Sequence, residues 1–408
     1  MHILESSTEV APPQVTKSHR RNVLLKTALS IIWLLALLEI APRIFFATNL
    51  VMHQSVRRAL LGNDDSSWRL FWIVAHRQHE EWTGKYSIYH PVRGWAVMPN
   101  IRNMTPFGKG KFVNSNSRGL RGSNEYSYSR IPGKQRILVL GDSFTFGTDV
   151  SDDETYSHYL QSSLPNVEVL NFGVQGYGQD QSLLYLQEEG VKYHPDVVLL
   201  GFMFMDTNRN LWNFFAFAKP KFEMTHDGLK LTNVPVPTPE QVLAREPYRS
   251  KAWDVAFILR EKIRWSLGMN EKEAMQLTRP ILEQMVRTTR SIGAIPVFVY
   301  MPAYEEVDDL SDSMSAHEQY LNAFCKEQDI ACMFLRPRFR HEALNGAKLE
   351  SRFHWTPEMH RMAADEIKSF LVQQGMVKNE ASVAASEVKQ PESASQFAES
   401  GRTQANLH

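Results

Sequence analysis

The fold class is indicated by one stretch of the 408-residue chain: Ile137-Leu138-Val139-Leu140-Gly141-Asp142-Ser143-Phe144-Thr145-Phe146-Gly147. An uninterrupted apolar run of this kind is typical of a strand that is buried on both faces, as in a parallel sheet. Small and polar residues follow at once, so the strand delivers a serine to a turn. Open α/β sheets place their sites outside the carboxyl ends of their strands. The stretch therefore predicts a buried strand that ends at a nucleophile, Ser143.

Residues 136–375 continue this pattern, with apolar runs that alternate with helical ones. Such alternation predicts one α/β domain around a parallel five-stranded sheet. An insertion at 211–250 carries the signature of a β-hairpin, with Asp227-Gly228 at its turn. We expect the insertion to overhang the carboxyl edge of the sheet, either shaping a substrate pocket or forming a passive surface loop. The predicted strands are 137–140, 167–171, 197–203, 296–301 and 331–335, and the helices are 152–164, 179–189, 271–292, 315–328 and 357–374.

The N-terminal region predicts a membrane anchor. A polar tail, 1–22, carries Lys17, Arg20 and Arg21 and precedes an apolar stretch, 23–47. Glu39 and Arg43 are spaced to pair on a helix, which lowers the cost of burying them. With them included, the stretch reaches the roughly 20 residues that a bilayer requires.

Basic residues on the N-terminal side place the tail in the cytoplasm. The rest of the chain is then extracytoplasmic, on the periplasmic side of the inner membrane. A cleaved signal peptide is one alternative for 23–47, although no small-x-small cleavage site follows at a suitable distance. A helix that lies on the membrane or packs in the core is another.

Two further segments flank the predicted domain. Residues 48–135 are interpreted as an N-terminal annex to the domain. A helix is predicted at 57–78, and the turn-rich part that follows carries a predicted short strand at 111–114. Residues 376–408 are rich in Ser, Ala, Glu and Gln, which is typical of a disordered tail.

Composition excludes several classes of function. The 45 basic and 45 acidic residues balance, so nucleic acid is not an expected partner. The two cysteines, Cys325 and Cys332, are too few for a disulfide scaffold or a four-cysteine zinc site. Two core thiols are the favoured interpretation. A single bridge is the alternative if the domain lies in an oxidising compartment.

Three strand ends and one late loop are expected to meet around Ser143. The loop 171–178 is rich in glycine, which lets backbone N–H groups approach a ligand closely. The loop 201–210 follows the third strand. A fourth segment, 354–360, precedes the last helix and carries His354, which can deprotonate a serine.

Together these segments resemble the SGNH (GDSL-like) hydrolase superfamily, and most closely its membrane-anchored bacterial branch. Gly141-Asp142-Ser143 is similar to the first block of the family, 171–178 to the second, and His354 with Trp355-Thr356-Pro357 to the last. The resemblance implies a three-layer α/β/α, flavodoxin-like domain, with Ser143 as nucleophile and His354 as base. It also implies that the amides of Ser143 and Gly176 form the oxyanion hole. No metal or organic cofactor is implied.

Two positions depart from the family pattern. Where relatives carry an oxyanion asparagine, this chain has Met205, which cannot donate a hydrogen bond. Where relatives carry an aspartate before the histidine, it has Arg352 and Ser351. Asp206, Asn208 and Glu350 are candidate supporting residues, and a Ser–His dyad is the remaining option. Asp142 and His360 are expected to be structural, and Asp206 is expected to pair with Arg209.

The leading hypothesis is therefore an anchored esterase or acyltransferase that acts on an ester-linked short acyl group, such as acetyl on a polysaccharide. Two alternatives remain open because of the two departures. One is a catalytically degenerate domain that binds glycan, and the other is a structural partner in an envelope complex.

Overall fold

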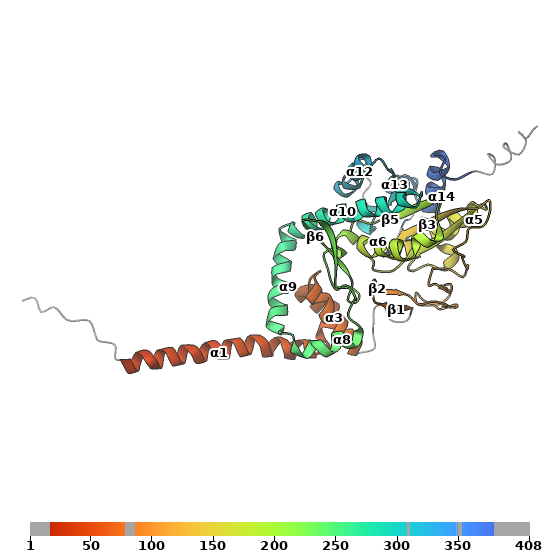
Figure 1. Ribbon diagram of the computed structural model, residues 1–408. Coiled ribbons are helices and arrows are strands. Elements are labelled where there is room, and N and C mark those ends of the chain that lie inside the picture. Colours follow the sequence, from red (N-terminus) through yellow and green to blue (C-terminus); the bar gives the residue numbers. More distant parts are fainter. Residues whose placement is uncertain (1–16, 78–85, 308–310, 348, 350–352, 379–408) are drawn as a thin grey trace, which may run out of the picture.

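A computed structural model describes residues 17–77, 86–307, 311–347, 349 and 353–378 (Figure 1). Its centre is a five-stranded sheet in the order β4-β3-β5-β8-β9, with every neighbouring pair parallel. The predicted α/β fold with a five-stranded parallel sheet is confirmed. The strands are β3 (Gln135–Gly141), β4 (Val167–Gly173), β5 (Val197–Phe202), β8 (Ile295–Tyr300) and β9 (Ala331–Phe334).

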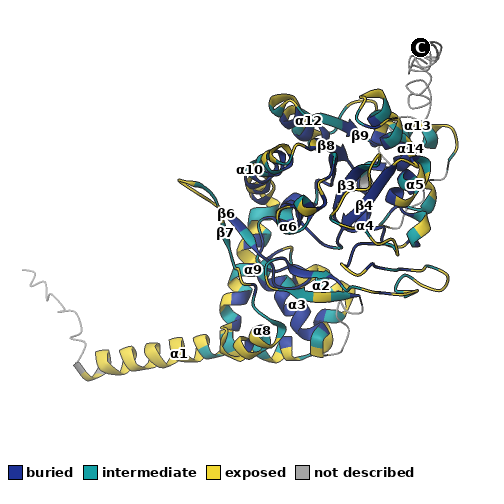
Figure 2. Ribbon diagram, turned by 45° about the vertical axis from the view of Figure 1, so that its right-hand side comes forward, coloured by how far each residue is buried: buried dark blue, intermediate teal, exposed yellow. Residues whose placement is uncertain are grey.

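Helices cover both faces of this sheet, which gives the three layers α/β/α (Figure 2). Successive residues of a strand point to opposite faces, so Leu138 and Leu140 enter one core while Ile137 and Val139 enter the other. The first core is closed by α6 (Gln179–Glu188), α10 (Met269–Ser291) and α12 (Ala316–Gln328). The second is closed by α5 (Tyr156–Ser163), α13 (Arg336–Leu344) and α14 (Pro357–Gln373).

The annex differs in detail from the sequence-based expectation. Its helical part consists of α2 (Gln54–Leu60) and α3 (Asp65–Arg77), and a hairpin follows, β1 (Ser87–His90) with β2 (Gly94–Val97). The strand predicted at 111–114 is wrong, since Val113 forms only an isolated bridge with Met104. Glycines at positive φ, Gly108 and Gly110, turn the chain there and prevent a longer ladder.

The insertion contains the predicted hairpin, β6 (Lys221–Thr225) and β7 (Gly228–Thr232), and β6 contacts α10. Two helices that were not predicted follow it, α8 (Pro239–Arg245) and α9 (Lys251–Ser266). Whether the hairpin shapes a pocket stays a prediction.

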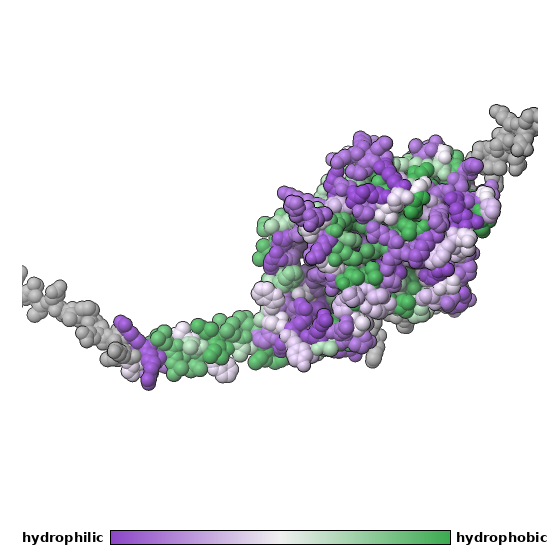
Figure 3. Space-filling model, viewed as in Figure 1, coloured by the Kyte–Doolittle hydropathy of each residue, from purple (hydrophilic) through white to green (hydrophobic). Residues whose placement is uncertain are grey.

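The helix α1 (Lys17–Ala47) leaves the domain and carries exposed apolar side chains along its length (Figure 3). The 28 residues 20–47 are long and apolar enough to cross a membrane, by length and composition. Glu39 and Arg43 form the predicted ion pair, at 2.6 Å. Arg20 and Arg21 lie at the far end of the helix, as expected for a basic flank.

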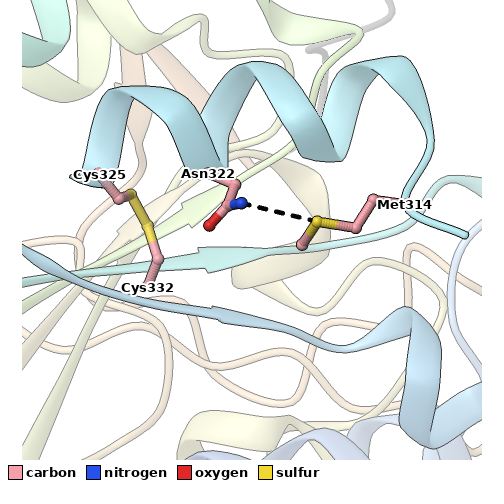
Figure 4. Close-up of a disulfide and its surroundings, with 4 residues drawn as sticks. All are labelled: Met314, Asn322, Cys325 and Cys332. Atoms are coloured by element: carbon pink, nitrogen blue, oxygen red, sulfur yellow. Dashed lines mark hydrogen bonds between the residues drawn. A yellow bond between two sulfur atoms is a disulfide. The ribbon is translucent and has the colours of Figure 1, made fainter. Parts of the chain in front are cut away.

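Cys325 and Cys332 form a disulfide that joins the last turn of α12 to β9 (Figure 4). The favoured interpretation of two core thiols is therefore wrong. The tight connection between α12 and β9 brings the two Cα atoms to 6.2 Å, a separation that a disulfide can bridge.

Candidate active site

Ser143 is the first residue of α4 (Ser143–Phe146), a short helix that begins directly after β3. The Asp142 carboxylate caps this helix by accepting a hydrogen bond from Phe144 N at 2.9 Å, as expected for a structural residue. A Cβ at Gly141 would lie 2.2 Å from Thr145 Oγ1, so only glycine lets α4 fold this closely onto the strand end. The carboxyl end of β3 is thereby followed at once by the serine.

The neighbouring strand β4 fixes the other side of α4. Asn171 donates from Nδ2 to Thr145 O and to Ser157 Oγ, both at 2.8 Å. A Cβ at Gly173 would lie 2.3 Å from Phe146 N, so this glycine is required for close packing. Asn171 and Gly173 therefore act by holding α4 in place.

His354 lies in the loop before α14, as the sequence suggested. Thr356 caps that helix by accepting from Met359 N at 3.3 Å, and the buried Trp355 donates from Nε1 to Pro302 O at 3.3 Å. Between these two anchors the imidazole faces α4. Its Nε2 lies 3.0 Å from Ser143 Oγ, which is hydrogen-bonding distance.

The other imidazole nitrogen contacts a residue that sequence reasoning missed. His354 Nδ1 lies 3.1 Å from Oδ2 of Asp149, in the loop that follows α4. Asp149 has φ +69°, a left-handed conformation that aspartate tolerates better than most residues. The signal in the sequence is an acidic residue in the same loop as the nucleophile, whereas the family pattern points to the residues before His354.

These contacts define the protonation of the imidazole. When Nδ1–H donates to Asp149, Nε2 is left without a proton and can accept the Ser143 hydroxyl. The hydrogen bond with His354 lowers the pKa of Asp149 below its ordinary value; partial burial opposes this, while the charges of His354 and Lys111 add to it. Asp149 therefore stays ionised near neutral pH and can stabilise an imidazolium.

The third loop forms a buried ionic cluster. Asp206 pairs with Arg209 in α7 (Asp206–Arg209), which confirms the expected ion pair. Arg209 Nη1 also lies 3.5 Å from Asp142 Oδ2 and donates to Tyr177 O at 2.8 Å. Burial raises the pKa of Asp206 well above its ordinary value, and Asp142 contributes in the same direction although Arg209 opposes.

The remaining candidate residues are less closely connected to the serine. Among the described residues, no hydrogen bond or ion pair joins Asp206 or Asn208 directly to Ser143 or His354, and the buried Oδ1 of Asn208 has no hydrogen-bond partner. Met205 is partly buried and packs against the second core. Gly176 lies in the loop after β4 with φ +76°, and its role as an oxyanion donor stays a prediction. Glu350 lies outside the described residues.

His360 occupies a structural position behind the site. It is buried, and its Nδ1 accepts from Tyr156 N at 3.3 Å. Burial lowers the pKa of His360 to about 3, and the proximity of Arg121 and His354 acts in the same direction. A search of the described residues for three or more His, Cys, Asp or Glu side chains that could hold a metal ion finds no such group.

Comparison with known proteins gives structural likenesses only. No family model and no curated protein matches the chain. A catalytic mutant of Axe2, an acetylxylan esterase from Geobacillus stearothermophilus, matches at 16% identity over 62% of this chain and 100% of that one, with TM-score 0.36. The psychrotrophic esterase EstA from a Pseudoalteromonas species matches at 13% over 59% and 98%, with TM-score 0.36.

A member of the lipolytic protein G-D-S-L family from Veillonella parvula also matches, at 12% identity over 59% of this chain and 97% of that one, with TM-score 0.34. Its description names the family that the sequence motifs resemble. At these identities and TM-scores, the activity of this chain has to be argued from its own residues.

Proposed function

We propose that this chain is an SGNH-type serine hydrolase acting on ester bonds, with Ser143 as nucleophile, His354 as general base and Asp149 as the acid that orients the histidine. One observation carries the proposal: His354 bridges Ser143 Oγ and Asp149 Oδ2 through its two nitrogens, at 3.0 and 3.1 Å. Nucleophile, base and orienting carboxylate within hydrogen-bonding reach are the signature of nucleophilic acyl transfer.

The reaction follows from this arrangement. Ser143 Oγ attacks the ester carbonyl while its proton passes to His354 Nε2, and the imidazolium is stabilised by Asp149. The amides of Ser143 and Gly176 are the proposed donors to the oxyanion. Collapse of the tetrahedral intermediate breaks the ester C–O bond, and the departing alkoxide takes the proton from Nε2. Water or a second hydroxyl then attacks the acyl-serine and gives its proton to His354 Nε2. The bond between the acyl carbon and Ser143 Oγ breaks, and Oγ takes the proton back, so the enzyme acts as an esterase or an acyltransferase.

Substrate class rests on the family resemblance, which suggests a short acyl group, such as acetyl on a polysaccharide. Met205 removes one oxyanion donor relative to that family, and such a loss costs about 10²–10³ in kcat in a well-studied protease. We therefore expect an active but slow enzyme.

We further propose that α1 is a single-pass anchor in the inner membrane, with a cytoplasmic N-terminus and a periplasmic domain. The length of α1, its exposed apolar side chains and its basic start support an anchor. The Cys325–Cys332 bridge supports an oxidising compartment for the domain.

The activity is tested with the full-length protein in detergent and a fluorophosphonate probe, which forms a covalent bond with an activated serine. We expect labelling of the unmodified chain, loss of labelling in Ser143→Ala, and strong slowing in His354→Ala. A folded, unmodified chain that takes up no probe would contradict the proposal and favour the catalytically degenerate, glycan-binding alternative.

A further inference from the structure

The helix α9 presents an unpartnered apolar face to solvent. Trp253, Leu259, Ile263 and Leu267 are exposed, and their spacing puts them along one side of the helix. Single exposed apolar residues are ordinary on protein surfaces, whereas a continuous apolar stripe marks an interaction site.

The opposite side of α9 is fixed to the annex. Ile258 is buried in a core cluster with Leu70 and Val74 of α3. Asp254 accepts a hydrogen bond from Arg69 Nη2 at 2.6 Å and another from Lys251 Nζ at 3.0 Å. The helix is therefore held so that its apolar stripe faces away from the protein.

The start of α9 is joined directly to α1. Glu39 accepts hydrogen bonds from Ser250 Oγ at 2.7 Å and from the backbone N–H groups of Lys251 and Ala252, each at 3.0 Å. Arg43 donates to the carbonyl oxygens of Pro247 and Arg249, at 3.1 and 2.8 Å. The first turn of α9 is thus held at the level of Glu39.

This level coincides with the end of the uncharged stretch 27–38 of α1. Figure 1 shows α9 running crosswise to α1, on the side of the domain from which α1 departs. If α1 crosses a bilayer, the plane of that bilayer is roughly perpendicular to α1. Because α9 is crosswise to α1, α9 then runs along the bilayer surface. The apolar stripe then lies where the hydrocarbon region ends and the headgroups begin.

We infer that the exposed face of α9 binds the surface of the lipid bilayer beside the α1 span, an inference that rests on the proposed membrane anchor. Trp253 and Tyr248, the latter 90% exposed, are the aromatic types that favour this interface. Arg249 and Arg260 contact Asp254 and Glu261, yet their side chains are 49% and 59% exposed, so their charged ends can also reach lipid phosphates.

The domain is then held to the membrane at two places, the α1 span and the exposed face of α9. A single span by itself leaves an attached domain free to tilt, whereas an interfacial helix crosswise to that span restricts the tilt. The Ser143 site would then keep one orientation relative to the membrane.

The inference is tested on the full-length chain in vesicles of phosphatidylcholine and phosphatidylglycerol. The native cysteines are joined in a disulfide, so one new cysteine can carry an environment-sensitive fluorophore. Leu259→Cys in α9 is compared with Leu344→Cys at the end of α13 and Leu35→Cys in α1, since these leucines are 56%, 57% and 59% exposed. Fluorescence is read with and without lipids that carry a quenching doxyl or bromine group near the headgroup.

We expect the Leu259 label to shift to the blue and to lose most of its emission to the quenching lipids, while the Leu344 label does neither. Quenching at Leu35 without quenching at Leu259 would overturn the inference and leave the anchor intact. No quenching at either position would overturn both. A blue shift at Leu259 without lipid quenching would show that a second copy or another protein covers the face, which also overturns the inference.

Discussion

Two aspartates follow neighbouring strands at the same edge of the sheet, and their surroundings are opposite. Asp149 has a side chain that is 52% exposed and faces His354, and its pKa is lowered by that contact. Asp206 is buried beside Arg209, and burial raises its pKa. The carboxylate suited to support the base is therefore the more exposed one. The buried carboxylate belongs to the packing of its own loop.

The largest expected effect comes from Asp149→Asn. The amide keeps the size of the side chain but no longer favours the imidazole tautomer that accepts the serine proton. We expect kcat to fall by about 10⁴, as for the equivalent change in a serine protease. Hydrolysis of an activated acetyl ester measures it, with the exposed Asp153→Asn as the control. A loss of less than tenfold would remove Asp149 from the mechanism.

The counterpart on the other loop is Arg209→Leu. This change leaves Asp206 and Asp142 close together without their shared cation, and breaking a buried pair typically costs about 3–5 kcal/mol in the free energy of unfolding. Urea unfolding measures the loss, with Arg287→Leu as control. Arg287 pairs with Glu283 at the surface, and such an exposed pair contributes about 0–1 kcal/mol. Equal losses in the two variants would show that the Asp206–Arg209 pair is not structural.

A smaller effect is expected from Met205→Asn, which restores a possible oxyanion donor beside Asp206. We expect kcat/KM to rise by up to about 100-fold, the lower end of what one such donor contributes. Met205→Leu is the matched control, since leucine has a similar volume and no donor. If both variants hydrolyse the ester at the same rate, the third loop does not reach the oxyanion.

The smallest effect, taken per pH unit, concerns His360, which is neutral and buried in the folded state with its pKa lowered to about 3. An unfolded histidine binds a proton below pH about 6.5. The contribution of neutral His360 to the free energy of unfolding is therefore fully present above that pH. It is lost as the pH falls toward 3, by about 1.4 kcal/mol per pH unit. Urea midpoints between pH 6.5 and 4 measure this slope.

His360→Gln should show a shallower decline over the same range, even if the variant is less stable at pH 7. Parallel curves for the two proteins would mean that His360 does not supply the acid sensitivity.

The sheet, the position of Ser143 and the position of His354 could be predicted from the sequence because each follows from local patterning. An apolar run marks each buried strand, and Gly141-Asp142-Ser143 marks the abrupt passage from β3 into α4. Asp149 could not be assigned in the same way, since it reaches His354 from a left-handed position in the loop after α4. Its proximity depends on the path of the loop after α4, and local patterning does not encode that path.

The helix α9 was hard to predict for a related reason. Apolar residues occupy both the side that packs on α3 and the exposed side opposite, so α9 lacks the contrast between a polar and an apolar face that marks a surface helix. The short strand predicted at 111–114 failed because propensity in a turn-rich segment is overridden by backbone geometry at glycine.

Glu39 makes the structure of the domain depend on α1. A leader that is cut away normally leaves the structure of the mature domain unchanged. Removal of α1 here would take away the acceptor of Ser250 Oγ and of two backbone N–H groups at the start of α9. The last turns of α1 therefore belong to the folded domain. A protease that cut after Ala47 would leave Ser250 as the cap of α9 but would remove the acceptor of the Lys251 and Ala252 N–H groups.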